Sequence, residues 1–205
     1  MIVVVTGPSA SGKTTWCRRH YPDVLVAEHV PIGMEPAETD PAALAAYWCG
    51  VNCRRWQEAT EREALSGLAV CDDDPLKLHY NWSLMLTGAA TPLSWAHALR
   101  ASREAVAAGR LGFADLVLVS LPSLDELRSR RVADPARQRR NFELHVRLVE
   151  PLRQWYQALE CVEPGRVVWD LPSDGLPAAT PPRRTQRCDL HLFDALIGAL
   201  PVLPC

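Results

Sequence analysis

The residues with the clearest chemical potential form a glycine-rich segment near the beginning of the sequence. Positions 7–14 read Gly-Pro-Ser-Ala-Ser-Gly-Lys-Thr, which fits the pattern G-x-x-x-x-G-K-[ST] at every fixed position. Glycines in such a loop let successive backbone N–H groups turn inward and surround an anion. The Lys13 ammonium would reach the outer phosphates of a nucleotide, and the Thr14 hydroxyl would ligate Mg²⁺. The residues expected to contact the nucleotide are Gly7, Ser9, Ala10, Ser11, Gly12, Lys13, Thr14 and Thr15.

The residues on either side give this motif the context that it requires. Residues 2–5 are all β-branched and apolar, which is typical of a strand buried on both faces. Residues 14–20 are polar and compatible with a helix, which Pro22 would end. The chain also has only two lysines, Lys13 and Lys77, since the other 20 of its 22 basic residues are arginines. A compact point charge at position 13 is therefore expected to have a specific role.

Carboxylates follow two further apolar runs that are predicted to be strands. Residues 24–27 lead into Glu28, and residues 68–71 lead into Asp72-Asp73-Asp74. Polar groups just beyond the carboxyl ends of parallel strands lie in the crevice where α/β proteins bind ligands. Glu28 is therefore a candidate general base or a hydrogen-bond acceptor for a substrate. The alternative for Glu28 is a solvated carboxylate at the end of a strand.

The acidic triplet after the predicted third strand fits the pattern in which a strand-end Asp holds Mg²⁺ opposite the loop threonine. Alternation along an extended chain would put Asp72 and Asp74 on one side and Asp73 on the other. We therefore predict Asp72 as a magnesium ligand together with Thr14, and Asp74 as a second candidate for the base. The alternative is an acidic cluster that stabilises the N-terminus of the next helix.

An arginine-rich segment, residues 128–141, is the third feature with chemical potential. It is predicted to be a mobile lid that closes over bound phosphates and brings guanidinium groups to the transferring phosphoryl group. The expected catalytic contacts are Arg137 and Arg139, and the expected nucleotide contacts are Arg131 and Arg140. A solvated basic helix face and an RNA-binding patch are the alternatives. The six arginines of the segment are Arg128, Arg130, Arg131, Arg137, Arg139 and Arg140.

The bulk properties of the chain limit the classes of protein to consider. Its 205 residues suit one α/β domain over residues 1–205, and a formal net charge of −2 does not indicate a general nucleic-acid binder. The sequence contains no run of about 18 apolar residues, so no membrane span is predicted. No signal peptide is recognisable either, and we therefore expect a cytoplasmic protein. The seven cysteines are expected to be reduced. A homodimer is left open.

The expected elements alternate along the chain. Strands are predicted at 2–5, 24–27, 68–71, 116–119 and 167–169, and helices at 14–20, 41–65, 76–86, 92–109, 142–159 and 188–200, with a further helix that begins after a capping box at 123–126. This order predicts a three-layer α/β fold in which a five-stranded parallel sheet has helices on both faces. Residues 171–205 would form a proline-rich irregular segment followed by the last helix. Glu28, the helix at 41–65 and residues 77–80 would form the acceptor pocket.

The order of a P-loop, a strand-end Asp and an arginine-rich segment resembles that of nucleoside and nucleotide monophosphate kinases. The nearest resemblance is to ribosylnicotinamide-kinase-like P-loop kinases, which also place a Glu after the second strand and an Asp-x-Asp after the third. Glu28 and Asp72-Asp73-Asp74 match these positions, and the resemblance covers residues 1–170. The Asp-Arg-Ser/Tyr signature of deoxyribonucleoside kinases is missing, which argues against that subgroup.

The resemblance implies transfer of a phosphoryl group from ATP, with Mg²⁺, to a hydroxyl or phosphate of a small molecule. A nucleoside, a nucleotide or a similar ring-bearing metabolite is the expected acceptor. A kinase that modifies an antibiotic or another secondary metabolite is an alternative. A GTP-binding switch and a nucleotide-binding module without catalysis are alternatives of another class, although the N/T-K-x-D motif that reads guanine is missing.

Overall fold

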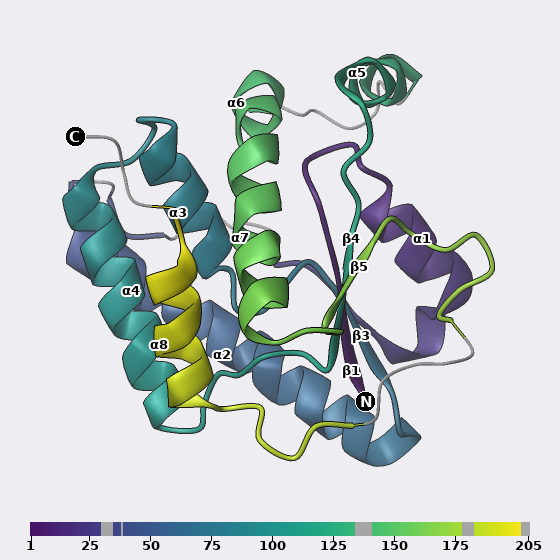
Figure 1. Cartoon of the computed structure of the whole chain (residues 1–205), viewed down its shortest axis with the longest axis horizontal. Coiled ribbons are helices and arrows are strands. Elements are labelled where there is room, and N and C mark those ends of the chain that lie inside the picture. The colour runs from purple at the N-terminus through teal and green to yellow at the C-terminus, as the bar shows by residue number, and fades with distance from the viewer. Residues whose placement is uncertain (30–34, 38, 134–140, 178–182, 202–205) are drawn as a thin grey trace.

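A five-stranded parallel sheet forms the centre of the molecule (Figure 1). The computed structural model describes residues 1–29, 35–37, 39–133, 141–177 and 183–201. The strand order is β2-β3-β1-β4-β5, and every neighbouring pair is parallel. All five predicted strands are confirmed, with bounds β1 Ile2–Thr6, β2 Leu25–Val26, β3 Ala69–Asp72, β4 Leu116–Val119 and β5 Val167–Trp169.

Helices cover both faces of the sheet, which confirms the predicted α/β fold with three layers. One face packs against five helices, and Ile2 and Val4 of β1 point to this side. The other face, to which Val3 and Val5 point, packs against α1 and the segment 171–176. The larger layer contains α2 (Pro41–Ser66), α3 (Leu78–Leu86), α4 (Pro92–Ala107), α7 (Val149–Val162) and α8 (Leu190–Ala199), and the smaller contains α1 (Lys13–His20).

Helix starts follow the capping chemistry of the sequence. The Asp40 side chain accepts a hydrogen bond from the Ala43 N–H at the start of α2, and Pro41 fills the first helical position. Before α5 (Leu124–Ala133), Ser123 and Glu126 form a capping box, in which each side chain accepts a hydrogen bond from the other residue's backbone N–H. These local signals fix where the helices begin and therefore where the preceding loops end.

The segment predicted as one helix over 142–159 forms two helices, so that prediction is wrong in this detail. α6 (Phe142–Arg147) ends at Arg147, and α7 begins at Val149, so that Leu148 alone separates the two helices. Pro151 explains the break, because proline has no N–H and its ring clashes with the carbonyl four residues earlier, which belongs to Arg147. α7 has a buried apolar stripe formed by Leu152, Trp155 and Leu159.

Neither a membrane-spanning helix nor a disulfide is found in the part of the chain that the structure describes. No helix there is both long and apolar enough to cross a membrane. The cysteines there carry free thiols: Cys17, Cys49, Cys53, Cys71, Cys161 and Cys188. Cys49 and Cys53 pack against the apolar core, as expected for small hydrophobic side chains.

Candidate functional site

The glycine-rich segment joins the central strand to α1, as the motif requires. Gly7 is indispensable here, because a Cβ atom at this position would lie 2.3 Å from the Ser120 carbonyl oxygen. Gly12 precedes α1 with a φ of +97°, a conformation that favours glycine. The Ser11 carbonyl accepts a hydrogen bond of 3.1 Å from the Ser120 hydroxyl, which ties the loop to the end of β4. The N–H groups of the first turn of α1 therefore face a loop of fixed shape, as anion binding requires.

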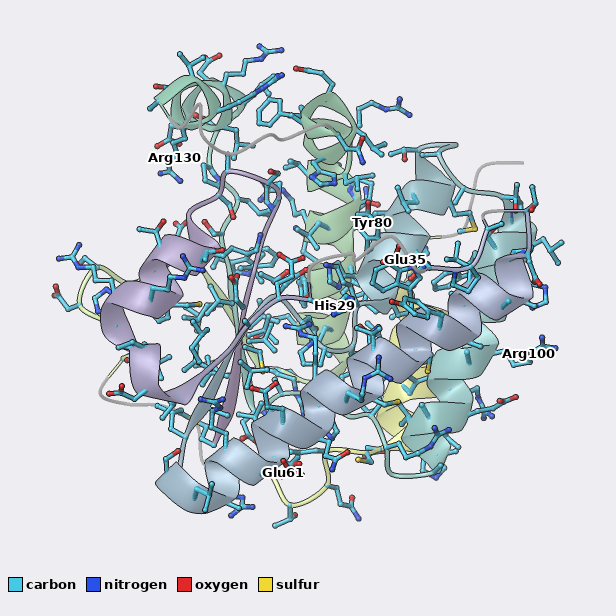
Figure 2. The ribbon with its side chains drawn as sticks, turned by 180° about the vertical axis from the view of Figure 1, so that it is seen from behind. His29, Glu35, Glu61, Tyr80, Arg100 and Arg130 are labelled. Carbon is cyan, nitrogen blue, oxygen red and sulfur yellow. The ribbon has the colours of Figure 1, made fainter. Side chains whose placement is uncertain are left out.

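Two cations contact this P-loop from different elements. Lys13 Nζ donates hydrogen bonds to the carbonyls of Gly7 (2.8 Å) and Pro8 (3.4 Å), so the ammonium lies over the loop. Arg130 projects from α5 (Figure 2), and its Nη1 donates to the Ser11 carbonyl at 2.8 Å. A phosphate group in the loop would thus meet positive charge from α1 and from α5.

Arg130 is a residue that the sequence interpretation did not single out within the arginine-rich segment. The neighbouring Arg131 pairs instead with Glu143 at 3.0 Å, and its guanidinium lies over the Phe142 ring. No sequence signal separates the two arginines, because Arg130 and Arg131 follow Leu127, the buried residue of α5, by three and four positions and so both lie about one turn after it. Arg137, Arg139 and Arg140 lie outside the described residues.

The predicted magnesium ligands come together. The Thr14 hydroxyl donates a hydrogen bond of 2.6 Å to Asp72 Oδ2, because the register of β1 and β3 places Val5 beside Asp72. Asp72 Oδ1 is buried and has no hydrogen-bond partner among the described residues. Burial raises the pKa of Asp72, although the Thr14 hydrogen bond and the Lys13 ammonium oppose this effect.

A hydroxyl and a carboxylate with one unused oxygen suit Mg²⁺, which prefers oxygen ligands. Within the described ranges, no three His, Cys, Asp or Glu side chains converge on a metal site made by protein alone. This is compatible with magnesium bound to a nucleotide, because such an ion takes one or two protein ligands and completes its shell with phosphate oxygens and water. The residues present therefore fit the ion.

The prediction that Asp72 and Asp74 share one side is wrong. Asp73 has a φ of +68°, so the chain leaves the extended conformation and the alternation ends there. Asp74 turns away from Thr14 and accepts hydrogen bonds from the Leu76 N–H (2.9 Å) and the Tyr156 hydroxyl (3.0 Å). Burial raises the pKa of Asp74 to about 7.

Asp73, for which no role is predicted from the sequence, connects the end of β1 to Lys77. Its Oδ1 accepts a hydrogen bond of 2.9 Å from the Thr6 hydroxyl at the end of β1, and its Oδ2 pairs with Lys77 at 2.8 Å. Burial would raise the pKa of Asp73, but the ammonium groups of Lys77 and Lys13 outweigh it and hold that pKa well below its ordinary value. Asp73 is therefore a buried, ionised carboxylate.

Glu28 follows β2 at the same edge of the sheet and shares the ammonium of Lys77. The distance from Lys77 Nζ to Glu28 Oε1 is 2.5 Å, and 38% of the Glu28 side chain is exposed. The end of β2 is fixed by the buried Arg55, whose guanidinium donates hydrogen bonds to the carbonyls of Ala27, Asp72 and Asp73. Arg55 thus holds the ends of β2 and β3 side by side.

Aromatic residues lie next to Glu28 in the chain and beside its partner Lys77. His29 and Trp48 make an edge-on contact with ring centres 5.7 Å apart, and Tyr80 contacts His145 in the same way at 6.1 Å. Lys77 Nζ lies 5.7 Å from the centre of the Tyr80 ring. Figure 2 shows His29 and Tyr80 near the middle of the molecule, with Arg130 above them on α5. Together these groups offer ring faces and an ionised pair beside the P-loop.

A P-loop between β1 and α1, in a parallel sheet of this order, gives the chain the fold of the P-loop nucleoside kinases. Three similar solved structures are of a deoxyadenosine kinase from M. mycoides. The structure with bound dCTP has a TM-score of 0.59 and 12% identity, over 84% of this chain and 93% of that one. The structure with the products dCMP and a flexible dCDP has a TM-score of 0.57 and 11% identity, over 97% of each chain.

The third of these structures, with bound dATP, has a TM-score of 0.55 and 13% identity, over 82% of this chain and 90% of that one. No model of a known protein family matches the chain, and no curated protein does. At such low identity the likeness shows a shared fold.

Proposed function

We propose that the protein transfers the terminal phosphoryl group of ATP, with Mg²⁺, to a hydroxyl of a nucleoside or a similar ring-bearing small molecule. One observation carries the proposal: the P-loop and the Glu28 carboxylate stand at the ends of strands that are separated only by β3. A phosphate donor on the loop and an acceptor hydroxyl at Glu28 would therefore meet over Asp72 and Asp73. Phosphoryl transfer requires little beyond such positioning and the stabilisation of charge.

Each described group has a distinct role in this proposal. Lys13 and Arg130 would stabilise the negative charge that spreads over the phosphoryl oxygens. Thr14 and Asp72 would hold Mg²⁺, which when bound neutralises charge on the nucleotide phosphates. Glu28 would orient the acceptor hydroxyl and receive its proton. The lid contacts of Arg131, Arg137, Arg139 and Arg140 remain predictions from the sequence.

Glu28 is a better candidate for the base than Asp74. Both oxygens of Asp74 already accept hydrogen bonds from protein groups, and its side chain is 7% exposed. Glu28 is more accessible, and its chain neighbour His29 contacts the Trp48 ring, which would help to hold a ring-bearing acceptor. A base must be within hydrogen-bonding reach of the proton that it takes.

The charges around Glu28 favour a hydroxyl acceptor over a phosphorylated one. Glu28 and Asp73 supply two negative charges, and within the described residues Lys77 is the one cation that forms an ion pair with them. A phosphate group on the acceptor would add negative charge to a site that is already negative, and would be repelled. The M. mycoides kinase structures hold deoxynucleotides, and the ribosylnicotinamide-kinase-like enzymes that the sequence resembles also suggest a nucleoside acceptor.

The test is acceptor-dependent release of ADP. The purified protein is incubated with ATP and Mg²⁺ and with separate panels of nucleosides, nucleoside monophosphates, sugars and aminoglycoside-type antibiotics, with Lys13→Ala as the control. Release of ADP with nucleosides and not with their monophosphates supports the proposal. Turnover with an antibiotic and with no nucleoside would show that the acceptor is an antibiotic and would contradict a nucleoside acceptor. Guanine-selective binding without transfer would instead indicate a switch, and ATP binding without transfer to any acceptor would indicate a module without catalysis.

A further inference from the structure

Lys77 lies between the two carboxylates of the acceptor side. Its ammonium is 2.5 Å from Glu28 Oε1 and 2.8 Å from Asp73 Oδ2. Burial alone would lower the pKa of Lys77, but the Asp73 and Glu28 carboxylates outweigh it and raise that pKa above its ordinary value. Lys77 is therefore a charged bridge at the N-terminus of α3.

The two ends of this bridge are held very differently. Asp73 is 5% exposed and also accepts a hydrogen bond from the Thr6 hydroxyl, so it is fixed to the end of the central strand. Glu28 follows a strand of only two residues at the edge of the sheet. In the described part of the chain, Lys77 is the one side chain that hydrogen-bonds the Glu28 carboxylate. The buried carboxylate of Asp73 thus holds the partly exposed carboxylate of Glu28 through one ammonium group.

The sequence adds an independent observation. The chain contains two lysines, and both lie beyond the carboxyl ends of the strands. Lys13 is on the P-loop, and Lys77 is between the two carboxylates. Elsewhere the chain uses arginine for its positive charges. A compact ammonium fits between two carboxylate oxygens that both approach within 2.8 Å, whereas a planar guanidinium spreads its donors over a wider fork.

We propose that Lys77 is a positioning residue, which holds the Glu28 carboxylate where it can accept the proton of the acceptor hydroxyl. This inference rests on the proposed function. Without the ammonium, a partly exposed glutamate would move among several rotamers, and two carboxylates would repel each other across the site. A displacement of about 1 Å at a reacting group can lower a rate by about 100-fold. Lys77 acts through Glu28 and need not touch the acceptor.

The experiment compares Lys77→Met, which keeps the length of the side chain but removes its charge, with Lys77→Arg, which keeps the charge. With a nucleoside acceptor, we expect kcat to fall by about 100-fold in Lys77→Met, with ATP affinity by calorimetry within about twofold of the wild type. Lys77→Arg should recover at least about tenfold of this loss, since the carboxylates remain neutralised. Arg103→Ala removes an exposed ion pair between α4 and α8 and serves as the control.

A double variant separates positioning from a general structural effect. If Lys77 acts through Glu28, then Lys77→Met combined with Glu28→Gln should be no slower than Glu28→Gln alone. Independent, multiplying losses would overturn the inference, as would a Lys77→Met protein whose kcat stays within about twofold of the wild type. A fall in melting temperature and in ATP affinity together would show a structural role and would also overturn it.

A second measurement does not depend on turnover. In a crystal structure of Lys77→Met, the Glu28 side chain should leave its present position or occupy several rotamers, and an unmoved carboxylate would overturn the inference. The two proposals can therefore fail separately. A wild-type protein that phosphorylates no acceptor would contradict the proposed function, whereas the position of Glu28 in the variant tests Lys77 directly.

Discussion

The Asp74 carboxyl group links a protonation step to the stability of the fold. Its oxygens accept hydrogen bonds from the Leu76 N–H and the Tyr156 hydroxyl, and burial raises its pKa from 3.8 to about 7. Because the folded protein binds this proton more tightly than the unfolded chain does, the group stabilises the fold fully below about pH 3.8. That stabilisation is lost progressively as the pH rises to about 7.

The substitution Asp74→Asn removes this titration and keeps the shape of the neutral side chain. The amide oxygen can accept from the Leu76 N–H, and the amide N–H can donate to the Tyr156 oxygen. One titrating group contributes about 1.4 kcal/mol per pH unit between its two pKa values. From about pH 5 to about pH 7, the wild type should therefore lose about 2 kcal/mol relative to the variant, and little more above about pH 8.

Urea unfolding followed by the fluorescence of the seven tryptophans gives the free energy of unfolding of both proteins. The stability of Asp74→Asn minus that of the wild type should increase by about 2 to 3 kcal/mol between about pH 5 and about pH 8. Parallel pH profiles, with a difference constant to about 1 kcal/mol, would refute the reasoning. Turnover of Asp74→Asn should be retained, and a loss of about 100-fold in a folded variant would return the role of base to Asp74.

The remaining predictions concern the phosphate side of the site. Lys13→Ala should lower kcat by about 100-fold or more, because the phosphates lose a point charge, and an unchanged rate in a folded variant would contradict this assignment. Asp72→Asn should raise the Mg²⁺ concentration for half-maximal activity by about tenfold, since an amide is a weaker ligand; an unaltered metal titration would place the ligand elsewhere. Arg130→Gln should lower kcat by about 100-fold, and a rate equal to that of Arg103→Gln would remove Arg130 from the site.

The strands and most helix limits were predictable because their signals are local. Unbroken β-branched runs such as residues 2–5 fit only strands that are covered on both faces. Asp40 and the capping box at Ser123 are residue patterns that predict helix starts, and the structure has a helix start at each of them. The break at Leu148 was also predictable from the sequence, because Pro151 disrupts a helix when the turn before it is helical too.

The directions of the site side chains were less predictable, because they depend on packing. Asp73 adopts a positive φ that is rare for any residue but glycine, and nothing in an acidic triplet says which member will do so. Arg130 and Arg131 are adjacent on α5, and only the way that helix packs decides which of them reaches the P-loop. Sequence reasoning therefore found the chemistry of the site but not every residue that carries it.

Because β2 lies at the margin of the sheet and β1 at its centre, the residues around Glu28 should tolerate substitution better than the residues around the P-loop. The P-loop follows the innermost strand, where a change would disturb neighbours on both sides. Glu28 instead follows a strand that has a single neighbour and only two residues. Substitutions around β2 can therefore change which acceptor binds, while the nucleotide-binding loop keeps its structure. A designer who seeks new acceptors would accordingly vary the surroundings of Glu28 and leave β1 untouched.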